Sequence, residues 1–265
     1  MMPDYSRYET LKIDVQDQVA TVTLNRPERL NAVNGQMHTE LEALLAEISD
    51  DDGINAIILT GTGRAFCAGG DIRGMDERAR EGSRRIPLRS AKRLIQNLLE
   101  VEQPLISAVN GDAVGLGATI ALFCDIVIAA ENARLGDTHI KVGLVAGDGG
   151  AIIWPLLIGV NKAKELLMTG DLLDAREAER LGLVNHVVPA GKAYDEALTL
   201  AKRLAAGPTR AIRWTKLAAN KRLKDEVNLV LDASLAVETL SAASEDHKEA
   251  ARAFVEKRPP RFTGQ

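Results

Sequence analysis

Aromatic residues are scarce in this chain of 265 residues: Phe, Trp and Tyr make up only 3% of it, although 46% is hydrophobic. Leu, Ile, Val and Ala must therefore fill the core. A chain of this length is expected to bury roughly 70–75% of the surface that it exposes when unfolded. Length and composition are those of a globular protein with one large domain, to which a smaller unit can be added.

An excess of charge of one sign is lacking too. The 33 Lys and Arg residues nearly balance 37 Asp and Glu residues, for a formal net charge of −4, so we expect neither nucleic acid nor a membrane as a partner. The longest apolar run, Ala151–Val160, contains Pro155 and is too short to span a bilayer. The polar N-terminus lacks the apolar segment of a signal peptide. We therefore expect a soluble, cytoplasmic protein.

Cysteine is almost absent. Cys67 and Cys124 lie far apart in apolar surroundings, which predicts buried free thiols and a reducing compartment. The histidines are too scattered to indicate a zinc site, and we expect no metal; they are His38, His139, His186 and His247.

Common catalytic and nucleotide-binding motifs are missing as well. Two glycine-rich loops are present, at 61–75 and 110–117. Neither completes a dinucleotide fingerprint, because Phe66 and Ile120 stand where the third glycine of each would fall. The sequence contains no Walker A, H-E-x-x-H, C-x-x-C or G-x-S-x-G motif. The sequence therefore lacks the usual motifs of nucleotide-phosphate binding, zinc proteases and serine hydrolases.

Hydrophobic patterning predicts an α/β protein. Alternation over 11–24 indicates a β-hairpin, and helical spacing over 37–48 indicates a helix with Asn34 as its N-cap. Buried strands are expected at 56–60, 105–109 and 125–130, with glycine-rich loops and further helices between them. Loops at strand ends are where such sheets usually bind ligands.

The C-terminal quarter has a different composition and pattern. Its Ala, Leu, Lys and Glu content predicts four helices and an extended tail, at 192–206, 208–220, 225–240, 245–256 and 257–265. We therefore divide the chain into an α/β core, 1–190, and a helical region, 191–265. No Pro/Ser linker separates the two parts, so we expect them to pack together.

The two glycine loops could aim two backbone N–H groups at one oxygen, as in an oxyanion hole, where one donor is worth about 3–4 kcal/mol. Glycine alone favours the alternative of tight turns. The order of several motifs, however, resembles the crotonase superfamily, the enoyl-CoA hydratase/isomerase group, over almost the whole chain. The matching stretches are "VATVTLNRPERLNAV", "GRAFCAGGDI", "PLISAVNGDAVGLGATIALFCDIVIAA", "LMTGD" with the text that follows it to residue 189, and "FVEKRPPRFTGQ".

This resemblance implies a crotonase-like spiral of ββα units with a C-terminal helical trimerisation region, giving a homotrimer or a hexamer built from two trimers. It implies an acyl-CoA thioester substrate, with coenzyme A as part of the substrate and no separate cofactor. The oxyanion donors would be the N–H groups of Ala68 and Leu116. The residues implied in contact with CoA are Arg29, Leu30, Ala32, Ala68, Gly70, Asp71 and Ile72, with Phe254 and Lys257 completing the nucleotide pocket of the same or a neighbouring subunit.

The sequence departs from the family at its acid/base positions. Typical hydratases carry two glutamates, at positions where this chain has Thr119 and His139. Histidine can accept and donate a proton at neutral pH. Threonine can only orient a water or a thioester, and an ordinary place in the first turn of its helix is equally open for Thr119. Asp148 follows Gly147, where some members have an acidic group; a catalytic role and an N-cap role for Asp148 are equally open. Asp137 is expected to be an ordinary loop residue.

We expect hydration or isomerisation of an enoyl-CoA in fatty acid metabolism, through a thioester enolate. The alternatives are dienoyl-CoA isomerisation, decarboxylation, thioester hydrolysis, or acyl-CoA binding without chemistry. An isomerase needs one shuttling base and no held water, which suits the loss of the glutamate pair. The acyl pocket is expected to be lined by the segment 76–89, predicted as a mobile surface helix or loop.

Overall fold

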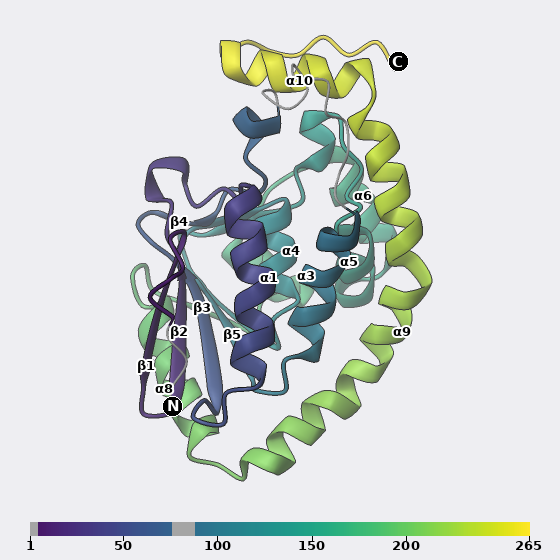
Figure 1. Cartoon of the computed structure of the whole chain (residues 1–265). Helices are drawn as coiled ribbons and strands as arrows, with labels where there is room; N and C mark the ends of the chain where they lie inside the picture. The colour runs from purple at the N-terminus through teal and green to yellow at the C-terminus, as the bar shows by residue number, and fades with distance from the viewer. Residues whose placement is uncertain (1–4, 76–87) are drawn as a thin grey trace.

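The computed structural model describes residues 5–75 and 88–265, and the expected acyl-pocket segment lies mostly outside them (Figure 1). Two sheets form the centre, six-stranded in the order β1-β2-β3-β5-β7-β10 and four-stranded in the order β4-β6-β8-β9. The first comprises β1 (Leu11–Gln16), β2 (Val19–Leu24), β3 (Ala56–Gly61), β5 (Leu105–Val109), β7 (Ile126–Ala130) and β10 (His186–Val188). The second comprises β4 (Ala65–Cys67), β6 (Asp112–Val114), β8 (Arg134–Gly136) and β9 (Leu173–Asp174).

The expected spiral of ββα units is confirmed by the connectivity. Each of the pairs β3–β4, β5–β6 and β7–β8 gives one strand to each sheet, and the units stack in parallel. The helices that follow these pairs are α3 (Leu88–Glu100), α4 (Leu116–Leu122) and α5 (Gly150–Ile158). The glycine-rich turns after β4 and β6 are thereby brought to the same edge of the molecule.

Local sequence signals account for the first elements. The hairpin β1–β2 turns at Asp17 and Gln18, both with positive φ, as a two-residue hairpin turn requires. Helix α1 (Gly35–Ser49) begins where predicted, because Asn34 Oδ1 accepts from the N–H of Met37 at 2.9 Å. Helices α1 and α3 pack together, while α8 (Ala193–Ala205) packs against β3, β5 and β7 with a row of buried alanines.

The helical C-terminal part differs from expectation in one respect. The two helices predicted at 208–220 and 225–240 form one continuous helix, α9 (Thr209–Ala242), which lies along the side of the molecule (Figure 1). The apolar periodicity lapses where α9 makes polar contacts with the end of α3. There Asn220 Nδ2 donates to the carbonyl of Leu99 at 3.4 Å, and Lys224 pairs with Glu100 at 2.8 Å. Helix α10 (Glu245–Glu256) and the extended tail beside it follow.

Shorter helices in the described residues include α6 (Val160–Thr169), α7 (Ala175–Leu181) and the 3₁₀ turns η1 (Pro27–Arg29) and η2 (His139–Val142). No helix in the described residues is long and apolar enough to cross a bilayer.

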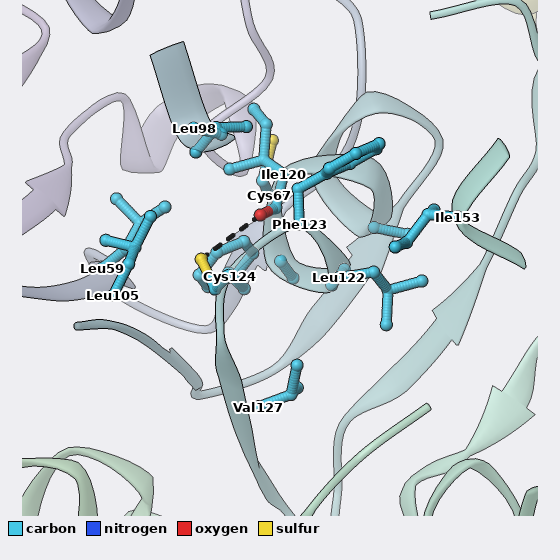
Figure 2. Packing of buried hydrophobic residues seen from close by; sticks show 14 of the residues in the cluster. Leu59, Cys67, Leu98, Leu105, Ile120, Leu122, Phe123, Cys124, Val127 and Ile153 are labelled. Atoms are coloured by element: carbon cyan, nitrogen blue, oxygen red, sulfur yellow. Dashed lines mark hydrogen bonds between the residues drawn. The ribbon is translucent and has the colours of Figure 1, made fainter. Parts of the chain in front are cut away.

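The two cysteines are buried free thiols, as predicted. Figure 2 shows Cys124 Sγ directed at the carbonyl of Ile120, 3.3 Å away, within the apolar cluster. Burial raises the pKa of Cys67 to about 12 and that of Cys124 further. Thiolate chemistry at neutral pH is therefore disfavoured for both.

Candidate active site

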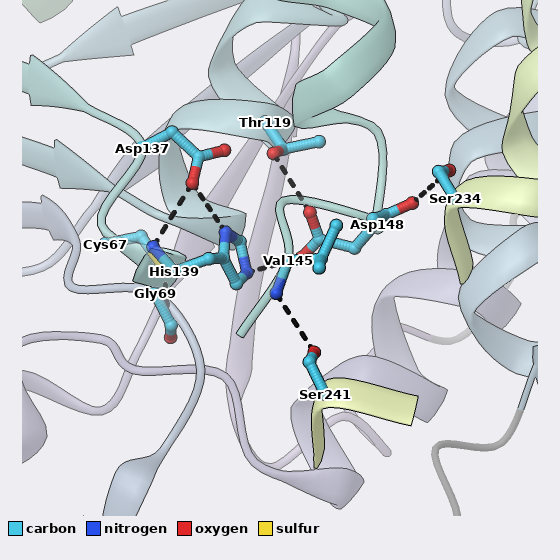
Figure 3. A network of polar contacts seen from close by, with 10 residues as sticks. Cys67, Gly69, Thr119, Asp137, His139, Val145, Asp148, Ser234 and Ser241 are labelled. Atoms are coloured by element: carbon cyan, nitrogen blue, oxygen red, sulfur yellow. Dashed lines mark hydrogen bonds and ion pairs between the residues drawn. The ribbon is translucent and has the colours of Figure 1, made fainter. Parts of the chain in front are cut away.

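His139 lies between two carboxylates at the start of η2. Its Nδ1 lies 2.7 Å from Oδ1 of Asp137, and its Nε2 lies 3.2 Å from Oδ2 of Asp148 (Figure 3). The backbone N–H of His139 also donates to Asp137, at 3.2 Å. The exposed fractions are 8% for His139, 1% for Asp137 and 9% for Asp148. A buried relay of two carboxylates and one imidazole results.

The relay favours the protonated imidazole. Burial by itself lowers the pKa of His139, but the charges of Asp148 and Asp137 outweigh it and raise the pKa well above its ordinary value. Since carboxylates only accept hydrogen bonds, both ring nitrogens donate when the ring is an imidazolium. Asp137, expected to be an ordinary loop residue, instead orients the ring.

Asp148 faces this relay rather than capping α5. The N-cap of α5 is Gly149, and no side chain caps the helix. Oδ1 of Asp148 instead lies 3.4 Å from the hydroxyl of Thr119, which projects from α4. Of the two roles left open for Asp148, the contacts favour a site role.

The glycines around Asp148 permit this close packing. A Cβ on Gly150 would lie 2.1 Å from Oδ2 of Asp137, and one on Gly149, where φ is +120°, would lie 2.9 Å from Cγ2 of Thr119. Side chains at these positions would drive the loop away from η2 and α4. The glycine-rich sequence therefore brings Asp148 to His139.

Glu238, on α9, is a site residue that no sequence motif predicts. Its side chain is buried, with 5% of the residue exposed, and one polar atom from each of His139, Asp148 and Glu238 lies within 4.8 Å of the others. Burial, followed by repulsion from Asp148, raises the pKa of Glu238 to about 8, while His139 opposes the shift. In the sequence Glu238 is one of many helical glutamates, and no motif singles it out.

His38, on α1, is one of the four histidines that are scattered in the sequence, and it makes a polar contact with α3. Its Nδ1 lies 3.1 Å from the hydroxyl of Ser90, which in turn donates to Glu42 at 2.7 Å. Burial lowers the pKa of His38, and the charges of Glu42 and Asp148 oppose this shift. Asp148 is thus close enough to influence a second histidine.

A cation is chemically conceivable at His139, Asp148 and Glu238, the one group of residues with such spacing in the described ranges. Metal ligands must be deprotonated. A cation would therefore compete with the protons that the buried charges place on His139 and Glu238. The expected absence of a metal stays a prediction.

The two glycine loops meet beside His139. A Cβ on Gly115 would lie 3.7 Å both from Cα of Gly69 and from Cε1 of His139. Leu116 begins α4, so its N–H has no acceptor within the helix, and its φ is not positive. The N–H of Ala68 donates to the carbonyl of Leu30 at 3.0 Å, so a ligand oxygen would have to displace that carbonyl.

Most of the expected CoA contacts lie on two adjoining segments. The N–H of Val33 donates to Gly69 at 2.8 Å, that of Asp71 donates to Val33 at 3.0 Å, and Arg26 pairs with Asp71 at 3.0 Å. These contacts join the segment of Leu30 and Ala32 to the segment of Ala68, Gly70, Asp71 and Ile72. Arg29 is exposed at the end of η1.

Phe254 and Lys257 lie elsewhere, on α10 and at its C-cap, with Phe254 53% exposed. Helix α10 itself packs on η2, where Nδ1 of His247 lies 2.7 Å from the carbonyl of Val142.

Comparison with known proteins gives consistent matches. Residues 14–265 match the family model described as enoyl-CoA hydratase/isomerase. A probable enoyl-CoA hydratase of Mycobacterium bovis is 38% identical, over 97% of this chain and 98% of the relative. A 1,2-epoxyphenylacetyl-CoA isomerase of Escherichia coli is also 38% identical, over 95% and 97%. The crystal structure of an enoyl-CoA hydratase/isomerase from Mycobacterium paratuberculosis superposes with a TM-score of 0.89 at 37% identity, covering 94% of this chain and 99% of that one.

Proposed function

Because the chain belongs to the enoyl-CoA hydratase/isomerase family, we propose that this enzyme moves the double bond of an enoyl-CoA thioester, with His139 and Asp148 as its proton-transfer centre. One observation carries the proposal: His139 is held between Asp137 and Asp148, while the other family glutamate position is occupied by Thr119. One proton-transfer centre is enough for isomerisation, whereas threonine cannot act as the second base of a hydratase.

The proposed reaction passes through a dienolate. The thioester oxygen of a 3-enoyl-CoA accepts from the N–H of Leu116, and from that of Ala68 once the Leu30 carbonyl is displaced. Each such donor is worth about 3–4 kcal/mol. The Asp148 carboxylate takes a proton from Cα, and the electron pair moves onto the thioester oxygen. Protonation at Cγ returns the pair and leaves the 2-enoyl-CoA. The imidazolium of His139 offsets the charge of the Asp148 carboxylate and, once Asp148 has taken the proton, the charge of the dienolate.

Hydration is the second candidate. It is favoured by the closeness of Asp148 and Glu238, since two carboxyl groups can hold a water between them. We expect it to be slower than isomerisation, because Thr119 contributes no charge.

A panel of thioesters tests the proposal: a 3-enoyl-CoA, crotonyl-CoA, a longer 2-enoyl-CoA and an aryl-CoA. We expect isomerisation of the 3-enoyl-CoA to fall about 10²–10⁴-fold in His139→Ala and Asp148→Asn. The exposed His186→Ala is the matched control and should retain activity. Efficient hydration that survives His139→Ala would contradict the proposal, and binding without turnover of any thioester would indicate an acyl-CoA-binding protein.

We further propose that α9 and α10 assemble the chain into a homotrimer or a hexamer of two trimers, in the cytoplasm. Large apolar side chains on these helices support assembly, with Trp214 62%, Leu229 75% and Leu240 72% exposed. The nucleotide of CoA would then contact Arg29 and, from the same or a neighbouring subunit, Phe254 and Lys257. Two buried free thiols suit a reducing compartment.

A further inference from the structure

Glu238 brings a carboxyl group into the site from a part of the chain 90 residues beyond Asp148. Helix α9 holds the loop before α5 from both sides of Glu238. The hydroxyl of Ser234 donates to the carbonyl of Gly147 at 2.7 Å, and the N–H of Val145 donates to Ser241 at 3.1 Å (Figure 3). Oε2 of Glu238 is buried without a hydrogen-bond partner among the described residues. One carboxyl oxygen of Glu238 is therefore buried beside Gly147 and left unpaired, and one of its oxygens lies within 4.8 Å of a ring nitrogen of His139 and an oxygen of Asp148.

The charges around Glu238 favour its neutral form. The groups that act on it are Asp148 before α5, Asp137 after β8 and His139 on η2. The imidazolium of His139 offsets one of the two aspartates, so an ionised Glu238 would add a second uncompensated negative charge to a buried site. Such a charge is costly to bury, and a group in this position keeps its proton instead. Burial and the charges of Asp148 and Asp137 raise the pKa of Glu238 to about 8, while His139 opposes the shift.

We propose that Glu238 is the second proton-transfer residue of the site, a neutral carboxylic acid that works together with the His139–Asp148 pair. This inference rests on the proposed isomerisation for its kinetic consequences. Asp148 takes the proton from Cα, and the O–H of Glu238 gives its own proton to Cγ as the electron pair returns from the thioester oxygen. Asp148, now neutral, then returns a proton to the Glu238 carboxylate across the short gap between them. Both residues are restored, and the substrate gains and loses one proton.

This assignment differs from a one-base shuttle in the origin of the new proton. A single base carries the same proton from Cα to Cγ, so little solvent hydrogen enters the product. The O–H of Glu238 exchanges with water between turnovers, so in D₂O the product should carry deuterium at Cγ.

The test compares the wild type with Glu238→Gln, which keeps the shape and the neutral charge but cannot transfer a proton. Glu226→Gln, on the same helix, is the matched control. With the 3-enoyl-CoA in D₂O, we expect Glu238→Gln to lose kcat about 10²-fold at nearly unchanged KM, and its residual product to contain much less deuterium at Cγ. Unchanged kcat and deuterium content in a folded Glu238→Gln variant would overturn the inference and leave the proposed isomerisation standing.

An infrared measurement needs no turnover. Wild type at pH 7 should show the C=O band of a protonated carboxylic acid that shifts with ¹³C-labelled glutamate, that is absent from Glu238→Gln and that titrates near pH 8. This readout in the wild type decides whether Glu238 is the neutral acid that the assignment requires, even when the chain isomerises no substrate or the variant fails to fold. An ionised Glu238 at pH 7, or a band that added Mg²⁺ or Zn²⁺ removes, would overturn it, the latter in favour of a cation site.

Discussion

At the scale of single residues, the site depends on how Asp137 holds His139. Both contacts of Asp137, to the ring and to the backbone N–H, come from one oxygen, and its other oxygen is buried without a partner in the described ranges. This arrangement fixes the proton on Nδ1, so Nε2 is the nitrogen that meets Asp148. Asp137 therefore sets the orientation of the ring and, after Asp148, contributes to its charge.

Asp137→Asn should weaken both the fixed orientation of the His139 ring and its positive charge. Removing one carboxylate lowers the pKa of His139 toward its ordinary value, so the imidazolium is lost at lower pH. The pKa of His139 is higher in the folded chain than its ordinary value, near 6.5. The imidazolium therefore stabilises the fold at pH values below 6.5, and this stabilisation is lost as the pH rises through the pKa of the folded state. We expect the basic limb of the kcat–pH profile to move to lower pH, with a loss of activity larger at pH 8 than at pH 6.

The exposed Asp171→Asn serves as the control for this profile. An unchanged basic limb in Asp137→Asn, with the fold intact by circular dichroism, would contradict the role assigned to Asp137.

At the scale of elements, the contact between α9 and the loop before α5 positions Glu238. Gly147 is the point of closest approach: a Cβ there would lie 2.4 Å from the carbonyl of Ser234 and 2.6 Å from Cβ of Glu238. Neither the backbone carbonyl of Ser234 nor Cβ of Glu238 can rotate away. The loop and the helix must therefore separate to accept any side chain at residue 147.

We expect Gly147→Ala to lower the free energy of unfolding by about 1–3 kcal/mol, as overpacking does, and to reduce kcat with it. Gly35→Ala is the matched control, since nothing lies within 4 Å of a Cβ there, and it should stay within about 0.5 kcal/mol of the wild type. Urea denaturation and the isomerase assay measure the two effects. Equal stability and activity of the two variants would refute the close packing of α9 on this loop.

The elements predicted from the sequence are those with local causes. The hairpin, the Asn34 cap and the buried strands each depend on residues a few positions apart, and the break at Gly207-Pro208 separates α8 from α9 as predicted. The sequence does not predict that α9 is continuous, because Asn220 and Lys224 in its polar middle contact α3, which is far away in the sequence.

Some residues of the candidate site can likewise be predicted from the sequence and others cannot. His139 and Thr119 stand out by motif position, Asp148 lies one residue after such a position, and the structure brings all three together. Glu238 could not be predicted, because its role comes from packing of α9 across 90 residues of chain rather than from its neighbours. The role of Asp137 could not be predicted from the sequence either. It follows from two hydrogen-bonding contacts of this loop residue with His139, one to the ring and one to the backbone N–H.

At the scale of the whole molecule, α9 has two different faces. Val227, Leu231 and Leu235 are buried against the core, on the side that carries Glu238. Leu229 and Leu240 are eleven residues apart, about three helical turns, so they share one outward stripe roughly opposite Glu238. The helix that completes the site thus also presents an apolar surface to the outside.

We expect this stripe to be covered by another copy of the chain. In the double variant Leu229→Glu, Leu240→Glu, two charges would have to be buried without partners, so the assembly should dissociate from three or six chains to one. Light scattering coupled to size exclusion measures the mass, with the exposed Lys221→Glu on the same helix as the control. A wild type that already elutes as a single chain, or a double variant that keeps the mass of the wild type, would show that α9 does not mediate assembly. If the dissociated variant also loses isomerase activity while its fold persists, assembly is needed to hold α9, and with it Glu238, against the site.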